Sequence, residues 1–135
     1  MEFDEIPVPT NDAEWDKLIA AWIEFEESEK RGSDKDSTRW AADAVDNWRY
    51  DDNHIALWDF ITRAFEKKMS DKAFAILAAG ALEDLLADFG ESYIERVEEL
   101  ARKNPRFNYL LGGVWKNAMT DDVWTRIENA RLTVW

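Results

Sequence analysis

Few side chains in this sequence could do chemistry, and the adjacent carboxylates Glu83 and Asp84 come first. Two carboxyl groups can act as general acid and general base when their surroundings separate their pKa values. Neighbouring helical residues point about 100° apart, however, so these two groups do not share a proton by default. A carboxylate in the first turn of a helix favours the positive end of the helix dipole and can bind free backbone N–H groups. We therefore expect a structural capping role for this pair, with partner contact and catalysis as the alternatives.

A metal site or an activated nucleophile would have to use His54, because it is the one histidine and the chain has no cysteine. Asp51 and Asp52 precede it in an expected turn, where acids serve as helix N-caps without a metal. A catalytic zinc site usually needs three protein ligands, and a Ser-His-Asp triad on His54 would lack the GxSxG elbow. We predict no catalytic residue, no metal site and no cofactor.

The dipeptide Gly112-Gly113 could be mistaken for a phosphate loop. It lacks the GxGxxG and GxxxxGK[ST] patterns, and no predicted strand precedes it. We interpret it as a helix end with a close approach between helices.

Eight tryptophans and an excess of acids are the most unusual features of the composition. The net charge is −12, and residues 1–52 hold 16 acids against 6 bases, whereas residues 53–135 hold 13 against 11. Such a field repels nucleic-acid phosphates and attracts basic protein surfaces. Tryptophan is also frequent at binding hot spots, and we expect one or two of Trp22, Trp40 and Trp48 to be partly exposed. The predicted partner-binding set is Trp22, Glu24, Glu26, Glu27, Trp40, Asp43, Asp46 and Trp48.

Apolar residues recur at helical spacing along the whole chain. The first helix is expected from about residue 12 to 30, after an extended segment 1–10, and residues 30–37 should form a polar loop. Expected caps are Asn11 with Glu14, then Ser37 or Asp36, Ser70, Pro105 as a first helical residue, and Thr120. For the third helix the expected inward stripe is Ile55, Trp58, Ile61 and Phe65, widened by Leu57 and Ala64.

The segment between Gly80 and Gly90 is expected to be one short helix, ended at each side by a glycine in the left-handed conformation. Leu82, Leu85, Leu86 and Phe89 should face inward, and Glu83, Asp84 and Asp88 outward. A last helix is expected to contain Val123, Trp124 and Ile127, and the tail RLTVW, residues 131–135, could pair, dock or fray.

These patterns predict an all-α protein, either a compact bundle or a short HEAT-like stack of seven to eight helices. One domain over residues 1–135 suits this length. No apolar run approaches the roughly 20 residues that span a bilayer, and the start has no secretory signal pattern. We therefore expect a soluble cytoplasmic protein.

The second half of the chain carries a dense pattern of glycines and leucines that ends in Leu-Gly-Gly-Val-Trp. Its positions are Gly80, Leu82, Glu83, Leu85, Leu86, Gly90, Ile94, Glu98, Ala101, Pro105, Phe107, Leu110, Gly112, Val114 and Trp115. Over residues 78–115 this pattern resembles a family of small bacterial domains of unknown function. Ala81 stands where that family often has a proline. The resemblance implies a helical domain and no particular activity.

Our leading hypothesis is a non-enzymatic acidic protein that occludes a basic surface of a partner, as immunity-type inhibitors do against toxins, nucleases or other nucleic-acid-binding proteins. It predicts that lysine at Glu26, Glu27 and Asp43 slows association. The alternatives are a nucleic-acid mimic, an accessory or scaffold domain, and an enzyme that uses Glu83 or Asp84. We expect no direct contact with nucleic acid or membrane, and a monomer or homodimer.

Overall fold

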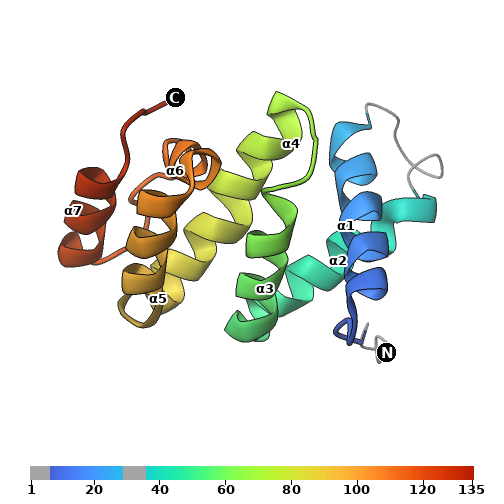
Figure 1. Ribbon diagram of the computed structural model, residues 1–135. Helices are drawn as coiled ribbons and strands as arrows, with labels where there is room; N and C mark the ends of the chain where they lie inside the picture. Colours follow the sequence, from blue (N-terminus) through green and yellow to red (C-terminus); the bar gives the residue numbers. More distant parts are fainter. Residues whose placement is uncertain (1–6, 29–35) are drawn as a thin grey trace. The chain divides into compact units, whose positions relative to one another are not determined.

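The computed structural model describes residues 7–28 and 36–135. Within these ranges the protein is helical, with turns and extended connections and no strand (Figure 1). The described helices form six continuous runs, because α4 (Asp71–Ile76), the π-helix η2 (Leu77–Leu82) and α5 (Glu83–Lys103) follow one another without a break. The all-α class is confirmed, and the expected count of seven to eight helices was slightly too high. The chain divides into two compact units, Met1–Ala64 and Phe65–Trp135, and a single domain over 1–135 stays a prediction.

The first unit contains α1 (Asp12–Glu27), α2 (Asp36–Tyr50) and α3 (His54–Ala64). The predicted N-cap of α1 is confirmed, since Asn11 Oδ1 accepts the Glu14 N–H at 2.9 Å and Glu14 Oε1 accepts from Asn11 Nδ2 at 3.1 Å. Thr10 also donates to Glu14, and this hydrogen bond lowers the pKa of the Glu14 carboxyl. The helix ends at Glu27, with Ser28 as C-cap, earlier than predicted. The predicted loop lies mainly outside the described residues.

Tryptophan rings build the core of this unit. The Trp15 and Trp48 ring centroids are 5.6 Å apart, and those of Trp22 and Phe60 are 5.2 Å apart in an edge-to-face arrangement. Such tilted pairs suit the charge distribution of aromatic rings. The rings therefore link α1, α2 and α3 through one aromatic cluster.

The predicted inward stripe of α3 was partly wrong. Ile55 is 66% exposed and Trp58 is half-buried, whereas Phe60, which was not predicted, is fully buried. Apolar residues occur on nearly every side of this helix, so their spacing left the phase ambiguous. The observed stripe consists of Ala56, Leu57, Phe60, Ile61 and Ala64.

The second unit contains α4, η2, α5, α6 (Pro105–Leu111) and α7 (Asp121–Ala130). Buried pairs recur every four residues along its first half: Ala73 and Phe74, Leu77 and Ala78, Ala81 and Leu82, Leu85 and Leu86. Four residues exceed one α-helical turn, so a regular helix would rotate this stripe by about 40° at each repeat. The wider π turn of η2 offsets that drift. The helix consequently runs through Gly80, which is not the predicted left-handed end.

A sharp bend interrupts α5 at Phe89, whose φ of −132° and ψ of 25° are not helical. Figure 1 shows the change of direction within α5. The predicted break is therefore real but lies one residue before Gly90. Gly90 allows close packing, because a Cβ atom there would lie 3.0 Å from Cγ1 of Val123 in α7.

The predicted caps of the second unit are confirmed. The Ser70 hydroxyl accepts the Ala73 N–H at 3.1 Å, and the Thr120 hydroxyl accepts the Val123 N–H at 3.2 Å. Pro105 occupies the first turn of α6, after Asn104 as N-cap. These caps fix where α4, α6 and α7 begin.

Candidate functional site

The predicted acidic residues lie on α1 and α2. Glu24, Glu27 and Asp43 are exposed, whereas Glu26 and Asp46 are half-buried. Asp46 forms an ion pair with Arg49 at 3.1 Å within α2. The described part of the first unit contains twelve acidic and four basic residues. The acidic residues are Asp12, Glu14, Asp16, Glu24, Glu26, Glu27, Asp36, Asp43, Asp46, Asp51, Asp52 and Asp59, and the basic residues are Lys17, Arg39, Arg49 and Arg63. We call the exposed carboxylates Glu24, Glu27 and Asp43 the acidic surface.

The three tryptophans of the predicted binding set differ in their exposure to solvent. Trp40 is half-buried, with Lys17 Nζ 6.0 Å from its ring centroid, so the expectation of a partly exposed ring is confirmed there. Trp22 and Trp48 are only 3% and 4% exposed. Their assignment as binding residues stays a prediction, but the expected exposure is not found at either position. The physical reason is that each ring packs against another aromatic ring of the first unit.

Glu83 was expected to face outward, and this was wrong. Its side chain is buried, and Oε1 accepts the backbone N–H of Trp115 at 2.8 Å while Oε2 accepts from Asn117 Nδ2 at 3.3 Å. The interpretation of Glu83 as a cap for free N–H groups between helices is confirmed, since Trp115 lies between α6 and α7. Both carboxylate oxygens therefore have donors supplied by one loop.

That loop holds Trp115 in solvent, with 68% of the residue exposed. Arg131 Nη1 donates to the Val114 carbonyl at 3.0 Å, and Lys116 pairs with Asp121, which lowers the pKa of the Asp121 carboxyl. Asn117 has a positive φ of 44°, which is uncommon outside glycine. The buried carboxylate of Glu83, the left-handed backbone of Asn117 and the exposed ring of Trp115 each differ from what these residue types usually adopt. Such departures concentrate at functional sites.

The segment 131–135 docks against α6, which resolves the prediction that it could pair, dock or fray. The Trp135 N–H donates to the Gly112 carbonyl at 3.0 Å, and Trp135 Nε1 donates to the Tyr109 carbonyl at 2.6 Å. A Cβ atom on Gly113 would lie 2.6 Å from the Trp135 ring and 3.0 Å from Cβ of Ala78. Gly112-Gly113 is thus a helix end at a close approach, as predicted, and the tail occupies part of that space.

Buried Asn108 anchors the start of this tail. Its Nδ2 donates to the carbonyls of Ala101 at 3.2 Å and Ala130 at 3.0 Å, and its Oδ1 accepts the Leu132 N–H at 2.8 Å. One amide side chain thereby joins the ends of α5 and α7 to the extended tail. Its polar atoms are used within the fold.

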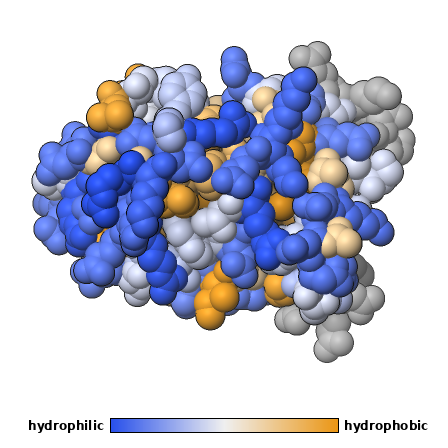
Figure 2. Space-filling view, viewed as in Figure 1, coloured by the Kyte–Doolittle hydropathy of each residue, from blue (hydrophilic) through white to orange (hydrophobic). Residues whose placement is uncertain are grey.

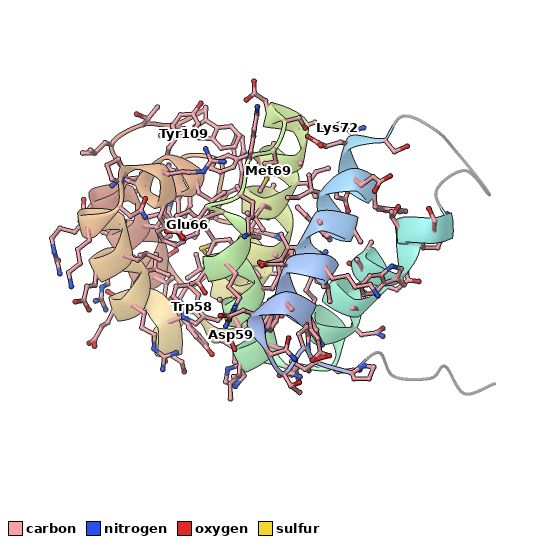
Figure 3. All side chains as sticks on the ribbon, turned by 45° about the vertical axis from the view of Figure 1, so that its right-hand side comes forward. Trp58, Asp59, Glu66, Met69, Lys72 and Tyr109 are labelled. Atoms are coloured by element: carbon pink, nitrogen blue, oxygen red, sulfur yellow. The ribbon has the colours of Figure 1, made fainter. Side chains whose placement is uncertain are left out.

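Three aromatic rings lie nearly parallel beside the tail. The Tyr109 and Trp135 centroids are 5.3 Å apart, and each is 6.0 Å from Phe74. The Arg106 guanidinium lies 4.8 Å from the Phe74 centroid and donates to the carbonyls of Phe65 and Lys67. Figure 3 shows Tyr109 at the upper edge of the second unit, on the same side as Met69.

A shallow groove of about 480 Å³ lies between α5 and α7, lined by residues that include Glu98, Arg102, Arg126 and Asn129. Two nitrogens of Arg126 donate to the two Glu98 oxygens, one of them at 3.0 Å. This paired contact lowers the pKa of Glu98 and raises that of Arg126. The ion pair ties the two helices together.

The surroundings of His54 give little geometric support for a metal site or an activated nucleophile. Asp52 has a positive φ of 57° in the turn before α3. Among residues 7–28 and 36–135, no group of three or more histidine or acidic side chains lies close enough to hold a metal ion. In the same part of the chain, no helix combines the length and the apolar character needed to cross a membrane.

Sequence reasoning missed Trp115, Tyr109 and Trp135 as exposed aromatic residues of the second unit. The available signal was the Gly-Gly pair two residues before Trp115, together with Glu83, an acid that directly follows the apolar Ala81 and Leu82. Periodicity could not reveal this contact, because it joins residues 32 positions apart.

Comparison with known proteins gives a family and no activity. No curated protein and no solved structure matches the chain. The model of a family of unknown function, DUF6869, matches residues 27–134, which extends well beyond the residues 78–115 that carried the resemblance. The chain belongs to this DUF6869 family.

Proposed function

We propose that this protein is a non-enzymatic binding protein that occludes a basic surface of a partner protein, as an immunity-type inhibitor does against a bacterial toxin or nucleic-acid enzyme. The observation that carries the proposal is the acidic surface of Glu24, Glu27 and Asp43, set in a unit whose described part has twelve acids and four bases. A field of one sign raises the rate of encounter with an oppositely charged protein and disfavours wrong partners.

The aromatic core gives this surface a rigid support. Trp22 of α1 and Trp48 of α2 are buried, so the exposed carboxylates belong to helices that are packed through these rings. Trp40 is the one predicted tryptophan left partly exposed, and Lys17 lies above its ring. The contact would therefore rely on charge more than on a large aromatic anchor, and salt should weaken it strongly.

Two features support a binding role over catalysis. Both oxygens of the buried Glu83 accept hydrogen bonds from the Trp115 loop, which suits a structural acceptor. Among the residues that the structure describes, the carboxyl groups whose pKa is shifted all have it lowered by hydrogen bonds from donors, which favours the charged form and not a proton donor at neutral pH. These groups are Glu14, Glu98, Glu99 and Asp121.

The test is affinity capture from a bacterial lysate with three immobilised proteins. These are the wild type, the variant Glu24→Lys/Glu27→Lys/Asp43→Lys, and a control, Glu91→Lys/Glu95→Lys/Glu128→Lys, which makes the same charge change on exposed residues of the second unit. Nuclease-treated samples at low and high salt are compared by quantitative mass spectrometry.

The proposal predicts a basic protein that the wild type and the control retain at low salt and that the first variant loses. High salt should release it, and the purified partner should lose its own activity when the wild type is added. Equal capture by the two variants, or a partner whose activity is unchanged, would contradict the proposal.

A further inference from the structure

Exposed apolar side chains gather on two touching segments of the second unit. The described chain has eight large exposed apolar residues, and five of them lie within residues 109–115 and 132–135. We call these five the tail patch: Tyr109, Trp115, Leu132, Val134 and Trp135, which are 48%, 68%, 88%, 66% and 38% exposed. In Figure 2, apolar colour on the visible face is confined to small areas, one of them at the upper left, at the end where Figure 1 places the C-terminal tail.

The tail patch is held in place before any partner arrives. Backbone and side-chain hydrogen bonds fix Trp135 to Gly112 and Tyr109, and Asn108 fixes the Leu132 backbone. Glu83 fixes the backbone of Trp115. A preorganised surface loses less conformational entropy when it binds, so more of its apolar area contributes to affinity.

The size of the tail patch suits an interface. With roughly 150–250 Å² for each large side chain, the five exposed fractions amount to roughly 450–750 Å². The largest apolar patch of a typical monomer is about 300–600 Å², and each partner of a standard interface contributes about 800 Å². The five side chains with a polar rim would thus supply most of what one side of a stable dimer needs.

Charge indicates which partner fits. The second unit holds twelve acids and ten bases, so it is nearly neutral, unlike the described part of the first unit. A strongly basic partner would not be attracted there, because the second unit has almost no net negative charge. A second copy that presents the same patch would meet apolar with apolar, through a unit whose charges are almost balanced.

We propose that the tail patch is the two-fold interface of a homodimer of this chain. A two-fold contact places the same residues on both sides, so one apolar patch is sufficient to form it. Leu132 and Val134 lie two positions apart in the tail, Leu132 at a bend and Val134 in the irregular segment that follows it. They are the two aliphatic residues of the tail patch, and their side chains would pack against the partner copy.

Sedimentation equilibrium of the full chain tests this, at roughly 10–100 µM, where a micromolar dimer is populated. The test variant is Leu132→Ser/Val134→Ser. The matched control is Tyr50→Ser/Ile55→Ser, which removes two exposed apolar side chains from the first unit, 79% and 66% exposed. Circular dichroism and thermal melting of each variant at low concentration report folding.

The expected result is twice the chain mass of 15.8 kDa for the wild type and the control, and 15.8 kDa for the test variant with unchanged helix content. A wild type that stays monomeric across this range overturns the proposal. A test variant that remains dimeric, or a control that becomes monomeric, also overturns it, because the interface would then lie elsewhere. If the test variant is unfolded, Leu132→Lys alone replaces it, because 88% of Leu132 is exposed in the folded monomer.

Discussion

At the scale of single residues, Glu83 links the fold to Trp115, the most exposed tryptophan among the described residues. Its carboxylate is removed from water, and the Trp115 N–H and the Asn117 amide replace the lost hydration. An N–H donor left unpaired in such a place costs about 1–3 kcal/mol, more than a typical hydrogen bond contributes. The stability of this loop should therefore depend on Glu83 far more than on the Trp115 ring.

We expect Glu83→Ala to lower the free energy of unfolding by about 1–3 kcal/mol, because two donors lose their acceptor. Glu83→Gln should cost less, since its amide oxygen can still accept the Trp115 N–H. The control Trp115→Ala should stay within about 0.5 kcal/mol, as exposed substitutions do. Urea unfolding followed by circular dichroism measures all three. Equal stability of the alanine variant at Glu83 and the wild type would refute this role.

The Glu98–Arg126 ion pair gives a prediction for pH. The Arg126 hydrogen bonds lower the pKa of Glu98 in the folded state, so the pair adds stability above the carboxyl's ordinary pKa of 4.5. That stability is lost as the pH falls through the lowered value, where the folded state also takes up the proton. The Glu98 and Arg126 side chains are 27% and 36% exposed, so solvent screening keeps the contribution of this ion pair small.

The measurement compares the unfolding free energy of the wild type and Glu98→Gln from pH 7 down to pH 3. We expect a constant difference down to about the ordinary pKa of Glu98, followed by a decrease. A difference that grows as the solution becomes more acidic would show that the sign is wrong.

At the scale of helices, the sequence allowed most elements to be predicted from caps and spacing. Asn11, Ser70 and Thr120 act as predicted, because a cap is a local contact over two or three residues. Gly80 was misread, because the π turn around it depends on packing along the whole run from α4 to α5. The phase of α3 was misread because its apolar residues surround the helix.

The candidate surfaces were predictable only in part. Charge is readable from composition, so the acidic residues on α1 and α2 were found. Exposure of an aromatic ring depends on tertiary packing, so Trp22 and Trp48 were assigned to the surface and Trp115 was overlooked. Helical spacing alone does not distinguish a tryptophan that fills a core from one that a loop holds in solvent.

The contact between α5 and α7 at Gly90 can be tested by a double-mutant cycle. We expect Gly90→Ala to destabilise the protein, because its Cβ would lie 3.0 Å from Val123 Cγ1 and the displacement of this packed side chain outweighs the roughly 0.5–1 kcal/mol that alanine gains over glycine within a helix. Combining it with Val123→Ala should recover part of that loss, so the two changes should not be additive. Thermal melting of the four proteins gives the coupling. Strict additivity would mean that the two residues do not press on one another.

At the scale of the whole molecule, the acidic surface and the tail patch belong to different units of the chain. The described part of the first unit carries the excess of acids, and the second unit carries five of the eight exposed large apolar residues. The two proposals therefore use different residues. Loss of dimerisation in the tail-patch variant would leave the acidic surface intact, so each proposal can fail without the other.

The measurement that tests the central claim most directly is the association rate of the captured partner, followed by stopped flow over a range of salt concentrations. For the wild type and the control Glu91→Lys/Glu95→Lys/Glu128→Lys, we predict a fast rate that falls steeply with salt. For Glu24→Lys/Glu27→Lys/Asp43→Lys, we predict a rate at least about tenfold slower at low salt and nearly independent of salt. Equal rates and equal salt dependence for all three proteins would contradict the account.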